Sequence, residues 1–256
     1  MRKFVVSCLV VLIGVGAASA QGTTDLLFSI YPDISQMRVV QGTSCVDSWS
    51  VNLLNSPLAV VDTVRTYGYN SSSLGAEYQI DGTPTGATYP WQGIESGSLL
   101  DGGTDGVEHN YAVDYNSTGV YQYDRDWANA VRLFNLSGAG ASGLTYDLVN
   151  GTLWFNRESG AGYQIEEYDL SGNLISSFTP NPTARGGLAY EPSTDTIWRV
   201  RNGAGVVDQF DKSGNLLQSF TVPELSGNYW GAEFQVPEPA SLSLLALAGL
   251  ILVRRR

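Results

Sequence analysis

The sequence predicts an all-β fold of repeated four-stranded units, arranged as a β-propeller. Two stretches are alike, and they read GLTYDLVNGTLWFN then IEEYDLSGNLISSFTP within 143–180, and GLAYEPSTDTIWRV then VVDQFDKSGNLLQSFTVP within 187–223. The composition agrees, because 29 Gly and 14 Tyr with only 15% charged residues are typical of strands and tight turns rather than helices.

The repeat has a fixed period, which identifies its unit. Tyr146 and Trp154 recur 44 residues later as Tyr190 and Trp198. Within each copy the pattern is strand, turn, strand, loop, strand, turn, strand. A period of this length with four short strands per unit is typical of a propeller blade.

Fainter copies extend the repeat over most of the chain. GAEYQI at 75–80 is echoed by GAEFQV at 231–236, and AVDYNSTGVYQYD at 112–124 has the same strand-turn-strand form. We therefore expect first strands to begin near residues 75, 112, 143, 187 and 231. Because the last has no room for a whole blade, residues 25–70 would supply the missing strands and close the ring from both ends. That gives about five blades of roughly 42 residues, or six if the N-terminal region holds more strands. A β-sandwich is the alternative fold.

Turn chemistry and a family resemblance agree with this assignment. Asp-x-Ser-Gly-Asn-Leu occurs at 169–174 and 211–216, and Gly-Asn favours a tight hairpin because both residues tolerate positive φ. The longer form Y/F-D-x-x-G-N-L-h-x-S-F resembles the repeats of NHL- and YVTN-type β-propellers. The resemblance is good over 143–223 and thin over 25–110, and it implies a fold without implying an activity.

The N-terminus has the three parts of a cleavable signal peptide. Basic residues at 2–3 precede an apolar run at 4–15 and an A-x-A cleavage site. We expect signal peptidase to remove residues 1–20, and the residues of that cleavage are Ala18, Ala20 and Gln21. A first transmembrane helix is the alternative, but the apolar run is shorter than the ~20 residues that span a bilayer.

The C-terminus resembles the PEP-CTERM sorting signal. A Pro-Glu-Pro triplet is followed by an apolar run at 240–253 and three arginines. The prolines would end the preceding strand and keep the triplet extended, and the arginines would stay cytoplasmic. The residues of this signal are Pro237, Glu238, Pro239, Arg254, Arg255 and Arg256. The expected organisation is a signal peptide at 1–20, a propeller at 21–236 and a sorting signal at 237–256.

The sorting signal implies a location rather than an activity. In proteins with this signal, a membrane protease-transpeptidase of the exosortase type is expected to process the tail, typically in Gram-negative bacteria. We therefore expect export to the cell surface or the extracellular space, with transient membrane attachment through the C-terminal helix. A permanent tail anchor is the alternative. The chain is also similar to propeller-like PEP-CTERM proteins, a comparison that supplies no activity.

Charge and cysteine content exclude some classes of protein. Five of the 14 basic residues lie in the terminal segments, which leaves nine against as many as 25 acidic residues. Nucleic acid and anionic membrane surfaces are therefore unsuitable partners, because both need cationic patches. Cys45 is the single cysteine outside the signal peptide, so the mature chain has no internal disulfide. We expect it to be a buried small hydrophobe.

The sequence contains no recognisable catalytic constellation, and we assign no catalytic residue. His109 is the single histidine, which excludes a multi-histidine zinc site, and no G-x-S-x-G elbow occurs. Asp101, Asp105 and Glu108 lie in a Gly-rich stretch that could hold calcium, with a solvated acidic turn as the alternative. Apart from calcium, we expect no cofactor.

Aromatic residues supply the ligand candidates. Trp91 and Trp127 lie in loop-like contexts, where aromatic faces could stack on sugars, whereas Trp154 and Trp198 repeat in register and are expected to pack blades. We expect an exported, non-catalytic propeller that acts as a binding or extracellular-matrix interaction module, with extracellular polysaccharide as its candidate partner. The alternative is a secreted hydrolase or lyase acting on polysaccharide or lactone. Carboxylates converging at the channel mouth would favour the enzyme, and an aromatic, acid-poor mouth would favour binding.

Overall fold

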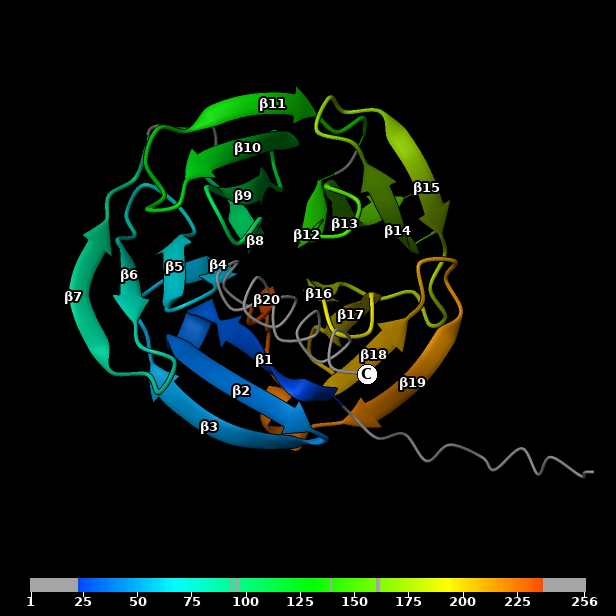
Figure 1. Ribbon diagram of the computed structural model, residues 1–256, viewed down its shortest axis with the longest axis horizontal. Coiled ribbons are helices and arrows are strands. Elements are labelled where there is room, and N and C mark those ends of the chain that lie inside the picture. The colour runs from blue at the N-terminus through cyan, green and yellow to red at the C-terminus, as the bar shows by residue number, and fades with distance from the viewer. Residues whose placement is uncertain (1–22, 93, 95–96, 139, 160–161, 237–256) are drawn as a thin grey trace, which may run out of the picture.

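The computed structural model is a five-bladed β-propeller, as the repeat predicts (Figure 1). It describes residues 23–236 apart from 93, 95–96, 139 and 160–161. Within this part of the chain, five four-stranded sheets surround a central axis, and all their strand pairs are antiparallel. The ring therefore has five blades rather than six, and the alternative β-sandwich is excluded.

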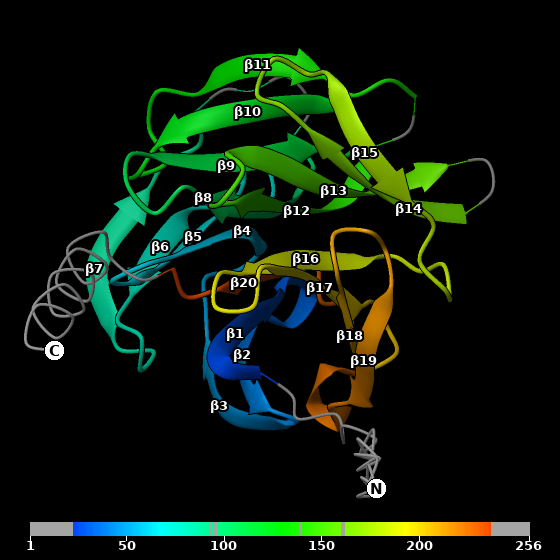
Figure 2. The same cartoon turned by 45° about the vertical axis from the view of Figure 1, so that its right-hand side comes forward.

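Each blade runs from an innermost strand at the axis to an outermost strand at the rim (Figures 1 and 2). Blade 1 consists of β20 (Gly231–Phe234), β1 (Thr23–Tyr31), β2 (Gln36–Gly42) and β3 (Ser44–Ser50). Blade 2 consists of β4 (Asn55–Val60), β5 (Val64–Gly68), β6 (Gly75–Tyr78) and β7 (Pro84–Tyr89). Blade 3 consists of β8 (Leu99–Thr104), β9 (His109–Asp114), β10 (Gly119–Asp124) and β11 (Val131–Asn135).

The two remaining blades carry the clearest sequence repeat. Blade 4 consists of β12 (Ala141–Asp147), β13 (Thr152–Ser159), β14 (Gly162–Tyr168) and β15 (Leu174–Phe178). Blade 5 consists of β16 (Gly186–Glu191), β17 (Thr196–Arg201), β18 (Val206–Phe210) and β19 (Leu216–Thr221). Two short 3-10 helices, η1 (Pro32–Ile34) and η2 (Pro223–Leu225), lie in the connections of blades 1 and 5.

The ring closes from both ends of the chain, as predicted. β20 pairs with β1 in the antiparallel register Leu27–Phe234 to Ile30–Gly231. The C-terminal segment thus supplies the innermost strand of a blade whose other three strands come from the N-terminal segment. This pairing joins the two ends of the chain within blade 1 by main-chain hydrogen bonds.

Two of the five expected first strands were wrong. Residue 75 begins β6, the third strand of blade 2, and residue 112 lies in β9, the second strand of blade 3. The innermost strands of these blades instead begin at Asn55 and Leu99. The error has a physical reason. All strand pairs in a propeller share the same alternation, so the pattern reveals a hairpin but not its distance from the axis. The starts expected near 143, 187 and 231 are confirmed within two residues.

The core lies between adjacent blades, and the repeated tryptophans pack it as predicted. Trp154 and Trp198 are both buried. Trp154 packs in one cluster with Leu188 and Tyr190 of blade 5, and the Trp198 ring lies 5.5 Å from that of Phe234 in blade 1. Every described residue of the innermost strands is buried except Tyr146, which is half-buried. Outermost strands such as β15 and β19 expose most of theirs.

The Gly-Asn hairpins also form as predicted. Gly172 and Gly214 adopt φ of +86° and +88°, a region that glycine enters without steric cost. In each turn the aspartate three residues earlier accepts backbone N–H bonds, as Asp169 does from Ser171 and Asn173 at 2.9 Å. These turns fix the register between the third and fourth strands of blades 4 and 5.

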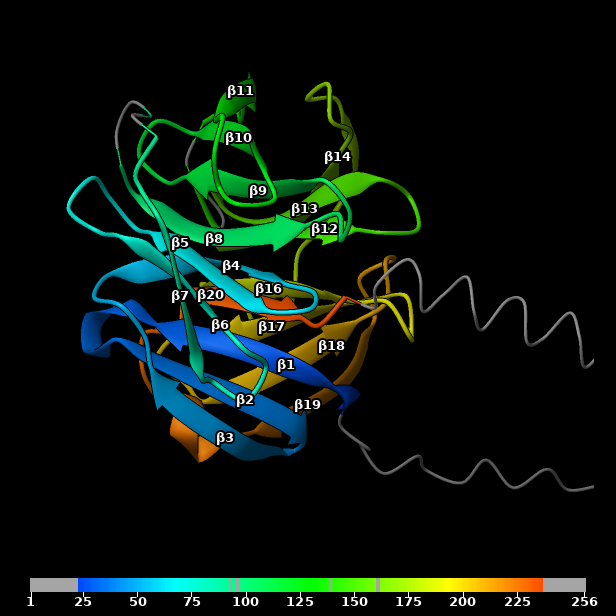
Figure 3. The same ribbon diagram turned by 60° about the vertical axis from the view of Figure 1, so that its left-hand side comes forward.

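The propeller has two faces, which we call the start face and the end face. The innermost strands run in the same direction, so all five begin on the start face and finish on the end face (Figure 3). Because β1 is antiparallel to β20, Thr23 at its beginning and Val236 just after β20 both lie on the end face. The described chain therefore begins and ends on the same face.

Candidate functional site

The innermost strands approach one another so closely that the central channel is closed at one level. Gly143, Gly187 and Gly231 recur every 44 residues at this level. A Cβ atom added at any of them would lie 2.0–2.5 Å from a backbone carbonyl oxygen of the next blade. Glycine is therefore required for the approach of these strands. In β8 the corresponding residue is Asp101 instead of glycine, and its side chain lies at the axis.

Asp101, in β8, joins four of the five blades through one carboxylate. Its Oδ2 accepts the backbone N–H of Leu144 at 3.0 Å and of Leu188 at 2.8 Å. Its Oδ1 accepts the N–H of Ala232 at 3.0 Å and of Gly102 at 2.9 Å. Leu144, Leu188 and Ala232 directly follow the three axial glycines, so the repeat itself aims these donors at one point. A carboxylate with four N–H donors is a strong, charge-assisted acceptor.

Glu233, in β20, is a second fully buried carboxyl beside Asp101. Its Oε2 accepts a hydrogen bond from Thr145 Oγ1 at 3.1 Å. Burial and the nearby charge of Asp101 raise the pKa of Glu233. Burial also raises the pKa of Asp101, but its four N–H donors oppose that effect because they favour the ionised form. The four N–H donors thus favour the ionised form of Asp101, whereas Glu233 has one hydroxyl donor and a neighbouring carboxyl, both of which leave it the better place for a proton.

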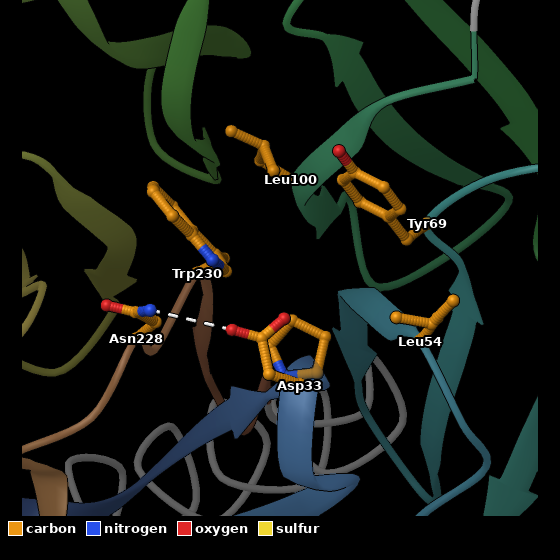
Figure 4. A pocket seen from close by; sticks show the side chains of 7 residues that line it. Asp33, Leu54, Tyr69, Leu100, Asn228 and Trp230 are labelled. Carbon is orange, nitrogen blue, oxygen red and sulfur yellow. Dashed lines mark hydrogen bonds between the residues drawn. The ribbon is translucent and has the colours of Figure 1, made fainter.

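A pocket of about 260 Å³ opens at the mouth of the channel on the start face (Figure 4). We call it the mouth pocket, and it is lined by Pro32, Asp33, Leu54, Tyr69, Leu100, Asn228 and Trp230. These residues come from the connections of blades 1, 2 and 5 and from the beginning of β8. Leu100 directly precedes Asp101, and Trp230 directly precedes the axial Gly231. The closed level of the channel is therefore the floor of the pocket.

Aromatic side chains form two walls of the mouth pocket. Trp230 and Tyr69 lie on opposite sides of it, with Leu100 between them (Figure 4). Tyr69 is held by its backbone, whose N–H donates to Leu54 O at 2.7 Å, and by its hydroxyl, which donates to Ser98 Oγ at 3.3 Å. The polar edge consists of Asp33 and Asn228, whose Nδ2 lies 3.5 Å from Asp33 Oδ2. An aromatic pair with a few polar groups is the usual composition of a small-ligand site.

Arg185 fixes the aromatic surroundings of the pocket. Its guanidinium lies 5.4 Å from the centre of the Trp230 ring and 5.1 Å from that of Tyr115. Its Nε donates to Tyr163 Oη at 2.6 Å, and Nη2 lies 3.6 Å from a carboxylate oxygen of Glu158. These contacts come from three blades and hold Trp230 in place before any ligand arrives. Burial opposes the charge of Arg185, but these partners leave its pKa raised.

The three candidate calcium ligands do not converge. The oxygens of Asp101 are both occupied by backbone N–H groups at the axis. Asp105 lies in the turn after β8 on the end face, where its Oδ1 accepts the N–H groups of residues 107–109 at 2.8–2.9 Å and its Oδ2 lies 3.1 Å from His109 Nδ1. Glu108 is exposed. In the described part of the chain, no group of three or more His, Cys, Asp or Glu side chains is placed to hold a metal ion.

The two candidate tryptophans lie away from the mouth pocket. Trp127 is fully buried and stacks on Tyr67, with ring centres 5.0 Å apart, so its side chain offers no surface to a ligand in this structure. Trp91 stacks on the same tyrosine at 5.8 Å and is half-buried. Both belong to the packing between blades 2 and 3.

The remaining residues selected from the sequence are Cys45 and those of the two terminal signals. Cys45 is a half-buried free thiol whose pKa is raised by burial. The cleavage residues Ala18, Ala20 and Gln21 and the sorting-signal residues at 237–239 and 254–256 lie outside the described residues. Within residues 23–236, apart from the small gaps, no helix is long and apolar enough to cross a membrane.

The pocket residues Trp230 and Tyr69 were not among the ligand candidates selected from the sequence. The loops that meet at the mouth differ in residue type from blade to blade, so the repeat does not reveal which of their residues lie together. One signal was available. Trp230 directly precedes the glycine that begins an expected first strand, which places it at one end of the central channel. A search for aromatic residues at strand starts, rather than in loop-like contexts, would have selected it.

The comparisons with known proteins support the fold. No protein-family model and no curated protein matches the chain. Among solved structures, a chain of the nidogen/laminin complex is similar with a TM-score of 0.59 and 12% sequence identity, over 83% of this chain and 99% of that one. A catalytically inactive virginiamycin B lyase from Staphylococcus aureus with quinupristin gives a TM-score of 0.49 at 12% identity, over 85% and 74% of the two chains. At 12% identity, the likeness to the chain of the nidogen/laminin complex shows the fold alone.

Proposed function

We propose that this protein is an exported, non-catalytic binding propeller that holds extracellular polysaccharide in its mouth pocket. The observation that carries the proposal is the pair of facing aromatic side chains, Trp230 and Tyr69, at the mouth of the channel. The C–H faces of a sugar ring carry partial positive charge and pack against the negative faces of aromatic rings. Asp33 and Asn228 supply an acceptor and a donor for the sugar hydroxyls.

The carboxyls of the channel support binding rather than catalysis. Asp101 and Glu233 are fully buried, and backbone N–H groups or a threonine hydroxyl occupy them. A general acid or base must reach the substrate within hydrogen-bond distance, which these two groups cannot do beneath the closed level of the channel. The pocket itself contains one carboxylate, Asp33.

The position of the pocket supports display. It opens on the start face, whereas Thr23 and Val236 lie on the end face. If the C-terminal signal attaches the chain to the membrane or the cell surface, as its resemblance implies, the pocket faces outward. Export itself rests on the two terminal signals.

The proposal is tested by screening the purified protein against an array of glycans and against chromogenic glycoside and lactone substrates. We expect retention on one or more glycans without turnover, lost in Trp230→Ala and kept in Trp91→Ala. The second variant is a matched control, because Trp91 is also a half-buried tryptophan but does not line the mouth pocket. Turnover of a substrate that is abolished by Asp33→Asn would show that the protein is an enzyme and contradict the proposal. Glycan retention that is unchanged in both Trp230→Ala and Trp91→Ala would show that the mouth pocket is not the binding site.

A further inference from the structure

We infer that the mouth pocket recognises one uncharged sugar residue at the end of a glycan chain. The inference rests on the proposed function and concerns the same site. It specifies which part of a polysaccharide enters the pocket, and which sugars are rejected.

The shape of the pocket limits the ligand to one residue. Its volume of about 260 Å³ is below the ~300–1,000 Å³ that is usual for sites of drug-sized ligands. Its floor is the level at which Gly231 and its equivalents bring the innermost strands into backbone contact. A chain cannot continue through this floor. A residue that enters end-on and reaches this floor is therefore a terminal one, with the rest of the glycan leading away from the start face.

The charges around the pocket favour a neutral residue. Asp33 is exposed at its edge, so the carboxylate of a uronic acid would meet a like charge there. The guanidinium of Arg185 lies over the Trp230 ring but is paired with Glu158, so it offers no free counter-charge to a uronic acid. A neutral residue, whose hydroxyl groups meet no such repulsion, is therefore favoured over an acidic one.

The polar edge of the pocket fits a pair of hydroxyls. The Asn228 Nδ2 to Asp33 Oδ2 distance of 3.5 Å is at the limit of a hydrogen bond, and both side chains are exposed. A sugar hydroxyl can accept from Asn228 and donate to Asp33, replacing this long contact by two shorter ones. Trp230 is already fixed by Arg185 and Tyr69 by its backbone, so little ordering is needed on binding.

The experiment measures affinity as a function of chain length and charge. Titration calorimetry of the purified protein would use neutral hexose and N-acetylhexosamine oligosaccharides of one to four residues, together with uronic-acid oligosaccharides of the same lengths. We expect the affinity for the best neutral sugar to change less than about threefold from two residues to four. We expect the matching uronic acid to bind at least about fivefold more weakly, since like charges at ~4 Å repel by ~1 kcal/mol even in bulk water.

Variants separate this inference from the proposed function. Asp33→Asn should recover most of the lost uronic-acid affinity, because the charge is removed and the shape is kept. Trp230→Ala should reduce all binding by about 30-fold or more, as expected for a buried aromatic anchor, and Trp91→Ala should change it less than about twofold. Unchanged melting temperatures would show that the variants are folded.

The outcomes are distinct. Affinity that grows with every residue up to four, or equal binding of uronic acids, would overturn the inference while leaving the proposed function in place if Trp230→Ala still abolishes binding. A sugar panel with no binding that depends on Trp230 would overturn both.

Discussion

Replacing Asp101 with asparagine tests whether one carboxylate holds the ring together. The carboxylate accepts four backbone N–H groups, two on each oxygen, from blades 1, 3, 4 and 5. Asparagine has one acceptor oxygen, so its amide nitrogen would face two N–H donors. An unsatisfied buried donor costs about 1–3 kcal/mol, and the expected loss of unfolding free energy is therefore about 2–6 kcal/mol. That is a large part of the ~5–15 kcal/mol that stabilises a typical domain.

Urea unfolding of the wild-type protein and the variant, followed by tryptophan fluorescence, would measure the loss. Asp105→Asn is the matched control, because its Oδ1 alone accepts three N–H groups and asparagine keeps that oxygen. It loses only the partly exposed contact with His109, which is worth about 1 kcal/mol or less. If Asp101→Asn were no less stable than Asp105→Asn, the axial carboxylate would not join the blades.

Three further predictions concern the buried charges and calcium. Because burial raises the pKa of Glu233, the folded state keeps a proton that the unfolded state releases above about pH 4.3, so this group should make stability fall with rising pH by up to ~1.4 kcal/mol per unit until the folded pKa is reached. Glu233→Gln should make the slope in urea unfolding between about pH 5 and pH 8 shallower, and Asp101, whose pKa burial also raises, accounts for any remaining slope of this sign. A slope as steep in Glu233→Gln as in the wild type would contradict the contribution of Glu233. Asp208 is fully buried, and Arg199 Nη2 and Arg201 Nη2 each lie 2.6 Å from one of its oxygens. Asp208→Asn should lower the free energy of unfolding by about 3–5 kcal/mol, because it leaves the buried Arg199 without a counter-charge. The control Asp62→Asn, which changes a partly exposed ion pair, should lower it by less than about 1 kcal/mol in the same assay. Millimolar calcium should leave the melting temperature unchanged, since the candidate ligands do not converge; a rise that Asp105→Ala abolishes would restore a calcium site.

The fold could be predicted from the sequence because each sequence repeat corresponds to one blade of the propeller. Trp154 and Trp198 occupy the same place in adjacent blades, so their spacing measures one blade. The closing strand at 231–234 was likewise visible as a first strand without the rest of its blade. Strand depth was not visible in blades 2 and 3, where β4 and β8 carry Pro57 and Asp101 in place of the glycines of the repeat.

The site was less predictable for a related reason. Asp101 was selected only as a candidate calcium ligand, because it lies close to Asp105 and Glu108 in the sequence. β8 instead places Asp101 at the axis and Asp105 at the end face. Trp230 and Tyr69 lie 161 residues apart in sequence and meet only because the ring closes. Sequence proximity cannot reveal a site assembled across the closure of a ring.

The most direct test of the binding account is the response of the six tryptophan indole N–H signals to a neutral sugar. In a spectrum of the ¹⁵N-tryptophan-labelled protein, Trp230→Phe identifies its signal by loss. Titration with a neutral oligosaccharide that the glycan array retains should shift the Trp230 signal and leave those of Trp91 and Trp127 in place. A shift confined to Trp91, or saturable binding with the Trp230 signal unmoved, would contradict the mouth pocket as the binding site.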